Sequence, residues 1–318
     1  MTVRHFLKDD DLSPAEQAEV LARAAAMKAD PFGDTALAGP QVVAVLFDKP
    51  TLRTQASFTG AIAHLGGHPM IIDGNLAQVG VRESIADVAR VLGRQSVAVV
   101  WRTFGQERIA EMAAHAGVPV VNALTDDYHP CQILADLLTI SEHKGRLAGL
   151  TMAYLGDGAN NMAHSYLVGG ATAGLHVRVA TPPTHQPKAE ILSRATEIAA
   201  PTGGSVMLTE DPYAAAYGAD VVVTDTWVSM GMEAEKGERQ GIGSPFEKFR
   251  VTPEVMGVAD PAAIFLHCLP AYRGFEVSAE VIDGPQSVVW DEAENRLHAQ
   301  KAVLSFLLQH ASADAVTP

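Results

Sequence analysis

Residues 41–47 read Gln-Val-Val-Ala-Val-Leu-Phe, and the polar run Asp-Lys-Pro-Thr-Leu-Arg-Thr-Gln follows at 48–55. A short apolar run that begins directly after Gly39-Pro40 is typical of a strand buried in a parallel sheet. The polar run then leads into a segment of helical composition. This stretch therefore predicts a strand, a loop and a helix in succession, which is the first part of a βαβ unit.

Short apolar runs separated by helical segments continue along the chain. Further strands are expected at 68–72, 97–101, 118–121, 150–155, 176–180, 205–208, 220–224, 263–267 and 287–290. Strands that alternate with helices predict parallel sheets covered on both faces. So many strands divide more naturally into two sheets than into one very wide sheet. We therefore expect an α/β fold with two doubly wound parallel-sheet domains joined by helices.

The boundary between these domains is expected near residue 145. A helix predicted at 131–143 ends at Lys144-Gly145, which gives domains of residues 1–145 and 146–318. The last helix, at about 294–310, is expected to return and pack on the first domain.

Two other segments have clear local patterns. Ser13, Pro14 and Glu16 form the capping box and first-position proline of a helix that is expected to run to residue 27. Residues 232–249, in contrast, are polar and Gly-rich with little periodicity, and this pattern predicts a mobile loop.

The composition is that of a globular protein with an acidic surface. The chain has 318 residues, and single cores usually stop growing at about 250–300 residues, which again favours two domains. It carries 23 Lys and Arg against 37 Asp and Glu, a formal charge of −14, and its pI is near 5.2. This charge argues against binding nucleic acid or an anionic membrane through overall attraction. An anionic substrate would need a few locally placed arginines and backbone N–H groups.

Two cysteines, Cys131 and Cys268, are too few for a secreted disulfide framework. The first residues contain no apolar signal-peptide core, and no window approaches the roughly 18 consecutive apolar residues of a membrane span. We therefore expect a cytoplasmic protein.

Ligands of parallel sheets bind at the carboxyl ends of strands, so the residues that follow each predicted strand are the candidates for chemistry. Thr51, Arg53 and Thr54 follow the first strand and lie at a helix start, where hydroxyls, a guanidinium and backbone N–H groups form an anion site. The plainer alternative is a helix cap with a solvated arginine. Arg102 follows the strand at 97–101. The alternative to a binding role is again a solvated arginine, here at the edge of the sheet.

Other candidates lie in loops that lead into helices. His129 precedes Gln132 by three residues, which places both on one helix face. Gly156-Asp157-Gly158 is followed by Asn160 and Asn161, and this spacing does not match a dinucleotide-binding fingerprint. Each of these signals is weak alone. Together with the polar residues after the strands at 220–224 and 263–267, they indicate an active site.

Taken together, these motifs resemble those of a known family, and the resemblance covers almost the whole chain. The chain is similar to the ornithine carbamoyltransferases of the aspartate/ornithine carbamoyltransferase family. The motifs that carry this resemblance are His129-Pro130-Cys131-Gln132, Asp225-Thr226-Trp227-Val228-Ser229-Met230-Gly231, His267-Cys268-Leu269-Pro270 and Glu294-Asn295-Arg296. The resemblance implies transfer of the carbamoyl group of carbamoyl phosphate to L-ornithine, giving L-citrulline and phosphate, in arginine biosynthesis. It also implies a cytoplasmic homotrimer with no metal and no organic cofactor.

The resemblance assigns residues to each substrate. Those implied to bind carbamoyl phosphate are Thr51, Leu52, Arg53, Thr54, Arg102, His129, Gln132, Cys268, Leu269 and Arg296, with Gln78 reaching the site of the adjacent subunit. Those implied to hold ornithine are Asn161, Asp225, Ser229 and Met230. The residues implied to act in catalysis are Arg53, Arg102, His129, Gln132, Asp225 and Cys268.

These residue types suit the chemistry. Because carbamoyl phosphate is already activated, no nucleophilic side chain or metal is required. Arg53, Arg102 and His129 can polarise the carbonyl oxygen and stabilise the oxyanion that develops. Asp225 and Cys268 are assigned to orienting the amine, whose proton can pass to the departing phosphate or to solvent.

The segment 51–59, part of which the resemblance assigns to carbamoyl phosphate, departs from the family pattern; we call it the phosphate loop. The family reads Ser-Thr-Arg-Thr-Arg and then Ser-Phe-Glu, whereas this chain has Leu52 in place of Thr, Gln55 in place of the second Arg and Thr59 in place of Glu. The lost Arg and Glu would lie four residues apart on one helix face, where they would pair. Their joint loss indicates a tolerated exchange.

This departure leaves alternatives open. One is a family member insensitive to toxins, such as phaseolotoxin, that occupy the carbamoyl phosphate pocket, or a member with a specialised pathway role. A second is a carbamoyltransferase for another amine, such as putrescine, lysine or an acylated ornithine. A third is an inactive, regulatory relative.

Overall fold

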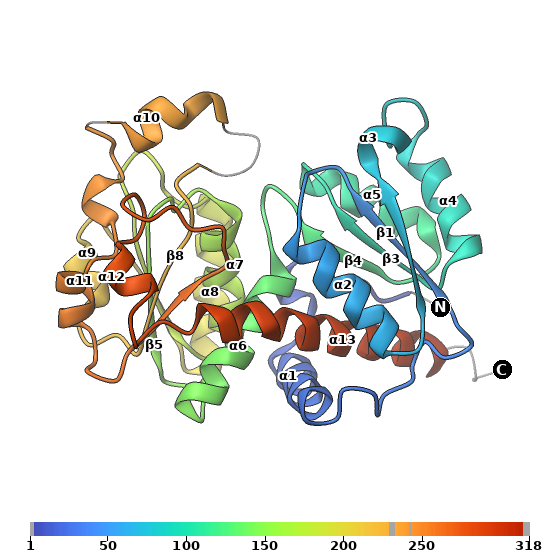
Figure 1. The fold of residues 1–318 in the computed structure, drawn as a ribbon, viewed down its shortest axis with the longest axis horizontal. Helices are drawn as coiled ribbons and strands as arrows, with labels where there is room; N and C mark the ends of the chain where they lie inside the picture. Colours follow the sequence, from blue (N-terminus) through green and yellow to red (C-terminus); the bar gives the residue numbers. More distant parts are fainter. Residues whose placement is uncertain (1–2, 229–232, 242, 314–318) are drawn as a thin grey trace. The chain divides into compact units, whose positions relative to one another are not determined.

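The computed structural model describes residues 3–228, 233–241 and 243–313, which form two compact units (Figure 1). Unit 1 comprises Met1–Ala135 and Glu294–Pro318, and unit 2 comprises Asp136–Ala293. The division falls within α6 (Pro130–Lys144) and within α13 (Val289–Ala313). The boundary predicted from the sequence lies at the end of α6.

Unit 1 is built on a four-stranded parallel sheet. Its strand order is β2 (His68–Asp73), β1 (Val42–Phe47), β3 (Ala98–Arg102) and β4 (Val120–Leu124). Ala44 and Leu46 belong to an apolar cluster with residues of α4 (Ile85–Gln95) and α5 (Gln106–Ala116), while the alternate residues Val43 and Val45 are equally buried. Because successive side chains of a strand point to opposite faces, both faces of this sheet are covered. This burial explains the unbroken apolar run at 41–47.

The helices of unit 1 follow the predicted pattern. They are η1 (Asp9–Asp11), α1 (Pro14–Ala29), α2 (Arg53–His64), α3 (Gly74–Ala77), α4 (Ile85–Gln95) and α5 (Gln106–Ala116), followed by parts of α6 and α13. The capping box of α1 is confirmed: Ser13 Oγ accepts from Glu16 N–H at 3.3 Å, and Ser13 N–H donates to Glu16 Oε2 at 2.9 Å.

Unit 2 is built on a five-stranded parallel sheet. Its strand order is β7 (Ser205–Thr209), β6 (His176–Ala180), β5 (Thr151–Leu155), β8 (Val221–Thr224) and β9 (Ile264–His267). Its other elements are α7 (Asn161–Thr172), α8 (Ala189–Thr202), α9 (Pro212–Ala216), η2 (Glu233–Glu235), α10 (Lys236–Gln240), η3 (Glu247–Phe249), α11 (Pro253–Val258) and α12 (Ala279–Ile282).

Two expectations were wrong. Residues 287–290 do not form a strand; Ser287 makes an isolated bridge to Phe265, and α13 begins at Val289. A run as short as this cannot be assigned to strand or helix from its apolar residues alone. The segment 232–249 was expected to be a mobile loop. Its described residues contain η2, α10 and η3, and Arg239, Phe246 and Phe249 are buried.

Strand order determines where ligands can bind. In unit 1 the order of connection reverses between β1 and β3, and in unit 2 it reverses between β5 and β8. Open parallel sheets bind ligands at such switch points, beyond the carboxyl ends of the strands. Phe47 is paired with Arg102 in unit 1, and Leu155 is paired with Thr224 in unit 2. The loops after these strands are therefore the places to examine.

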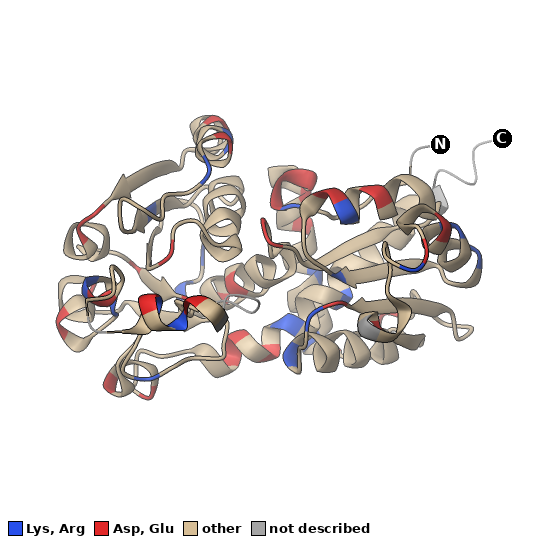
Figure 2. Cartoon of the chain, turned by 90° about the horizontal axis from the view of Figure 1, so that it is seen from above, with Lys and Arg blue, Asp and Glu red and all other residues tan. Residues whose placement is uncertain are grey.

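Charged residues are spread over the helices and loops of each unit (Figure 2). Within the described part of the chain, no helix is both long and apolar enough to cross a membrane.

Candidate functional site

The first candidate cluster lies in unit 1, beyond β1 and β3. Thr54 is buried near the start of α2, and its Oγ1 accepts hydrogen bonds from Arg296 Nη2 at 2.8 Å and from Arg102 Nη1 at 3.5 Å. Arg296 Nη1 also donates to Gln132 Oε1 at 2.7 Å. Arg102 and Arg296, which are far apart in the sequence, therefore converge on one hydroxyl group.

His129 is surrounded by these positive charges. It is buried, and burial together with the charges of Arg296, Arg102 and Arg53 lowers its pKa well below the ordinary value. The imidazole is therefore neutral at pH 7. Three guanidinium groups around a neutral ring provide the charge and the donors that recognise a phosphate or a polarised carbonyl.

Arg53 is the first residue of α2, and one nitrogen of its guanidinium is an unused donor among the described residues. Its Nε is buried and has no hydrogen-bond acceptor among the residues that the structure describes. Since buried polar atoms are normally paired, this donor is available to a ligand. Thr51 Oγ1 accepts from Thr54 N–H at 3.3 Å, and so stabilises the start of the helix.

The unusual residues of the loop are exposed to different extents. The Leu52 side chain is 79% exposed and Gln55 is exposed, while Thr59 is half-buried. An Arg–Glu pair at positions 55 and 59 would have one partner in solvent, where ion pairs contribute about 0–1 kcal/mol. The loss of both charges therefore costs this protein little.

Gln78 stands apart from this cluster. It is exposed, with a φ of +48°, and its backbone N–H donates to Gly74 O at 2.7 Å. Its side chain forms no hydrogen bond with the described residues. The structure of the single chain therefore leaves Gln78 outside the group formed by Thr54, Arg102 and Arg296.

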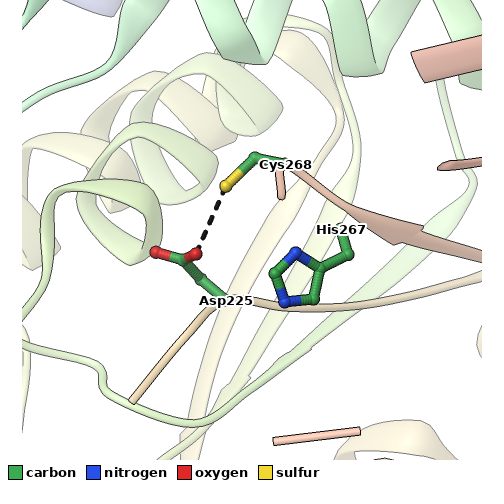
Figure 3. Close-up of side chains that lie close together, drawn as sticks. All are labelled: Asp225, His267 and Cys268. Carbon is green, nitrogen blue, oxygen red and sulfur yellow. Dashed lines mark hydrogen bonds between the residues drawn. The ribbon is translucent and has the colours of Figure 1, made fainter. Parts of the chain in front are cut away.

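The second cluster lies in unit 2, beyond β5, β8 and β9. Asp225 is buried, and its carboxylate accepts from Cys268 Sγ at 3.2 Å (Figure 3). It also accepts from Thr226 N–H at 2.7 Å and from Asn160 Nδ2 at 3.3 Å. Burial raises the pKa of Asp225 from its ordinary value, although the donors around it oppose that shift. In the described part of the chain Asp225 forms no ion pair with Lys or Arg. A buried acid of this kind is suited to receiving a cationic amine.

Cys268 is held as a thiol. Burial and the nearby acids, Asp225 foremost, raise its pKa well above the ordinary value, so the sulfur donates its proton to Asp225. The adjacent Leu269 has a φ of +58°, and its N–H donates to His267 Nδ1 at 2.9 Å. Cys268 and Leu269 therefore belong to the unit 2 cluster with Asp225.

These residues also present atoms that metals bind. One potential ligand atom each from Asp225, His267 and Cys268 lie within 4.8 Å of one another, and carboxylate, imidazole and thiolate are all zinc ligands. However, His267 Nδ1 accepts from Leu269, and Nε2 faces Glu276 Oε1 at 3.3 Å. Metal binding would require His267 to give up one of these partners and Cys268 to lose its proton.

The predicted ornithine residues differ in outcome. Asp225 is central to this cluster, whereas Ser229 and Met230 lie outside the described residues. Asn161 is half-buried at the first position of α7, and it is its neighbour Asn160 that contacts Asp225. Tyr154, whose hydroxyl accepts from Asn160 Nδ2 at 3.0 Å, was also missed. The pair Asn160-Asn161 was the available signal, but a sequence cannot show which amide points inward.

Comparison with known proteins places both parts of the chain in one family. Residues 4–142 match the carbamoyl-P binding domain of the aspartate/ornithine carbamoyltransferase family, and residues 148–307 match its Asp/Orn binding domain.

Individual relatives match at nearly full length. The ornithine carbamoyltransferase of Leifsonia xyli subsp. xyli is 61% identical over 313 residues, covering 98% of this chain and 99% of its own length. The crystal structure of anabolic ornithine carbamoyltransferase from Campylobacter jejuni is 36% identical, with a TM-score of 0.89, and covers 96% of this chain and 99% of its own. Ornithine carbamoyltransferase from Pyrococcus furiosus is 44% identical, with a TM-score of 0.90 and coverage of 95% and 96%. The chain therefore belongs to the aspartate/ornithine carbamoyltransferase family.

Proposed function

We propose that this protein is an ornithine carbamoyltransferase that forms L-citrulline and phosphate from carbamoyl phosphate and L-ornithine, in arginine biosynthesis. The observation that carries the proposal is the convergence of Arg53, Arg102 and Arg296 around the neutral His129 in unit 1. In an acidic protein, such a group of arginines is suited to one small, strongly anionic substrate. The near full-length identity to ornithine carbamoyltransferases supports the same assignment.

The unit 1 cluster supplies the carbamoyl phosphate side of the reaction. Arg53 and the N–H groups at the start of α2 bind the phosphate, with Thr51, Thr54 and Arg296 around it. Arg53 also donates to the carbonyl oxygen, together with Arg102 and with His129, which lies next to Gln132. These donors stabilise the oxyanion that forms when an amine attacks the carbonyl carbon. Leu52 contributes through its backbone, because its side chain points into solvent.

The unit 2 cluster supplies the amine side. Asp225, held by Asn160 and Cys268, orients the ornithine amine, with Asn161, Ser229 and Met230 assigned to the rest of the amino acid and Leu269 to the carbamoyl group. The amine must lose a proton before it attacks, and the Cys268 thiol is already protonated, so the proton leaves with the phosphate or passes to solvent. The new bond joins the amine nitrogen to the carbonyl carbon, and the bond from that carbon to the phosphate oxygen breaks.

The proposal includes a cytoplasmic homotrimer in which Gln78 completes the site of an adjacent subunit. Gln78 lies in an exposed segment together with Leu76 and Val81, whose side chains are 81% and 82% exposed. Apolar side chains this exposed suit a subunit interface, as does a neighbouring polar side chain that forms no hydrogen bond with the described residues. The free thiols of Cys131 and Cys268 suit a reducing compartment.

A second candidate is a toxin-insensitive form of the same enzyme. It is favoured by Leu52, Gln55 and Thr59, which all lie on the phosphate side of the site. Restoring the family residues, as Leu52→Thr, Gln55→Arg and Thr59→Glu together, is expected to increase inhibition by a transition-state analogue that carries a phosphate-like group. Equal inhibition of the restored and natural proteins would contradict this candidate.

The main test is to measure citrulline and phosphate released by the purified protein, with carbamoyl phosphate varied at saturating ornithine. We expect the two products in a 1:1 ratio, with the KM for carbamoyl phosphate reporting the effect of the altered loop. Separate assays contain putrescine, lysine or an acylated ornithine in place of ornithine. A folded protein that carbamoylates one of these amines and not ornithine would overturn the proposed substrate.

A further inference from the structure

Arg239 is a buried residue that the proposed mechanism does not use. We propose that Arg239 is a positioning residue that holds the loops after β5 and β8 in the arrangement that presents Asp225 to ornithine. This inference rests on the proposed function and adds a specificity-determining residue to the same site.

Arg239 joins segments that are far apart in the sequence. Its Nη1 donates to Asp157 Oδ2 at 2.5 Å and to the Trp227 carbonyl oxygen at 3.0 Å. Its Nε donates to Glu235 Oε2 at 2.6 Å, and its guanidinium lies 5.4 Å from the centre of the Phe246 ring. Arg239 is 7% exposed and Asp157 is 2% exposed, so this ion pair is shielded from water.

Two of the partners of Arg239, Trp227 and Asp157, are connected to Asp225. Trp227 lies two residues after Asp225 in the same loop, so the bond to its carbonyl fixes one end of that loop. On the other side, the carbonyl oxygen of Asp157 accepts from the Tyr154 hydroxyl at 3.1 Å. The same hydroxyl accepts from Asn160 Nδ2, which also donates to Asp225 Oδ2. Arg239 therefore fixes the surroundings of the Asp225 carboxylate from two directions.

The side chain at position 239 must bond both Asp157 and the Trp227 carbonyl oxygen, and this explains why arginine is needed there. A guanidinium can donate to two acceptors at a fixed angle, whereas the ammonium of lysine is a point charge on a flexible chain. In Arg239→Lys, the charge of Asp157 would still be balanced, but Asp157 and the Trp227 carbonyl would no longer be held together. Removal of the cation altogether would leave a buried carboxylate without a partner.

Replacement of Arg239 should weaken the binding of ornithine and leave the binding of carbamoyl phosphate unchanged. The proposed carbamoyl phosphate cluster of Arg53, Arg102, His129 and Arg296 belongs to unit 1, whereas the partners of Arg239 all belong to unit 2. A displaced Asp225 weakens the hold on the amine. Arg239→Lys is therefore expected to raise the KM for ornithine by about tenfold, with the KM for carbamoyl phosphate within about twofold of its natural value.

The experiment compares Arg239→Lys with Glu235→Gln in steady-state citrulline assays with each substrate varied in turn. Glu235 is the matched control, because it bonds the same guanidinium through a half-exposed side chain. We expect Glu235→Gln to keep both KM values within about twofold. An unchanged KM for ornithine in Arg239→Lys would overturn the inference, as would an equal rise in both KM values or a loss of kcat alone.

Asp157→Asn gives a second route should Arg239→Lys fail to fold. This substitution keeps the size of the side chain and removes the charge, and the same selective rise in the KM for ornithine is expected. Folding of each variant is checked by circular dichroism and melting temperature. If the natural protein forms no citrulline, the proposed function fails; if it is active and the variants respond as the control does, only the role of Arg239 fails.

Discussion

At Thr54, one hydroxyl oxygen accepts hydrogen bonds from two guanidinium groups, although these groups repel each other. Burial strengthens that repulsion, because charges in the interior are poorly screened. The neutral His129 avoids adding to it. A bound anion would reduce this repulsion, so we expect carbamoyl phosphate to raise the melting temperature of the protein.

Arg53→Met is expected to reduce kcat/KM for carbamoyl phosphate by about 10²–10³-fold, the usual effect of removing a donor to a developing oxyanion. Because the substitution also relieves repulsion, the melting temperature of the empty protein should not fall. Citrulline assays and calorimetry check both points. The control is Arg90→Met, since Arg90 is an exposed arginine in α4. A similar loss of activity in both variants would contradict the role of Arg53.

The lowered pKa of His129 predicts the pH dependence of the reaction. A histidine whose folded pKa lies well below its ordinary value of about 6.5 stays neutral throughout the range in which histidines usually titrate. The profile of kcat/KM for carbamoyl phosphate should therefore have no inflection near pH 6.5 that depends on His129. His129→Asn should lower the whole profile without changing its shape between pH 6 and 8. An inflection in this range that disappears in the variant would show that His129 titrates.

Individual residues differ in how well the sequence predicts their place. Arg102 and His129 could be found because they follow predicted strands, and parallel strands end at one edge of a sheet. The contact of Asn160 with Asp225 was not predicted, because which residues face Asp225 depends on the exact start of α7. Arg239 carries no local signal at all, since its partner Asp157 lies 82 residues earlier in the chain.

Among the elements, the strands are the best predicted. The expected and observed ends of β1 to β9 differ by three residues at most, and β6 was predicted without error. Strands buried on both faces have continuous apolar runs that contrast with the loops around them. At 287–290 the same kind of run is the beginning of a helix. Asp291 and Glu292 lie in its first turn, where acids favour helix formation, and they were the signal against a strand.

The start of α1 provides a test of local electrostatics. A hydrogen bond from Arg4 lowers the pKa of Glu16 to about 2, whereas a glutamate in an unfolded chain has a pKa of about 4.3. A carboxyl group with a lowered folded pKa stabilises the fold above its unfolded pKa, and this contribution is lost as the pH falls towards 2. Glu16→Gln should therefore lower the free energy of unfolding by roughly 1 kcal/mol near pH 7, and by progressively less below about pH 4.5.

Urea titrations at several pH values measure this difference. Glu19→Gln is the control, because the Glu19 side chain is half-exposed and pairs with Arg23 in the next turn. A Glu16→Gln effect that is the same at pH 3 and pH 7 would show that the charge of Glu16 does not contribute.

For the whole molecule, the sequence predicted two α/β units, but a single chain cannot show how subunits complete each other. The exposed Gln78 predicts complementation between defective subunits. Arg53→Met and Gln78→Ala proteins should each have low activity. In trimers that contain both variants, about a third of the sites would pair a natural Arg53 with a natural Gln78 from the neighbour.

Co-purification of two differently tagged variants, followed by the citrulline assay, measures this recovery. The control is a mixture of the two proteins purified separately and kept as preformed oligomers, which should stay inactive. No recovery in verified hybrids would show that Gln78 does not serve a neighbouring site.

Unit 1 is assembled from both ends of the chain, and this has a consequence for how the protein is made. Unit 2 is one continuous stretch, so all of its residues have been joined to the chain once residue 293 is added. Arg296 is added 164 residues after its partner Gln132. During translation the anion-binding cluster therefore remains unfinished while the unit 2 cluster already has all its residues. A nascent chain that stalls before Arg296 would contain every residue of the unit 2 cluster, but its unit 1 cluster would lack Arg296.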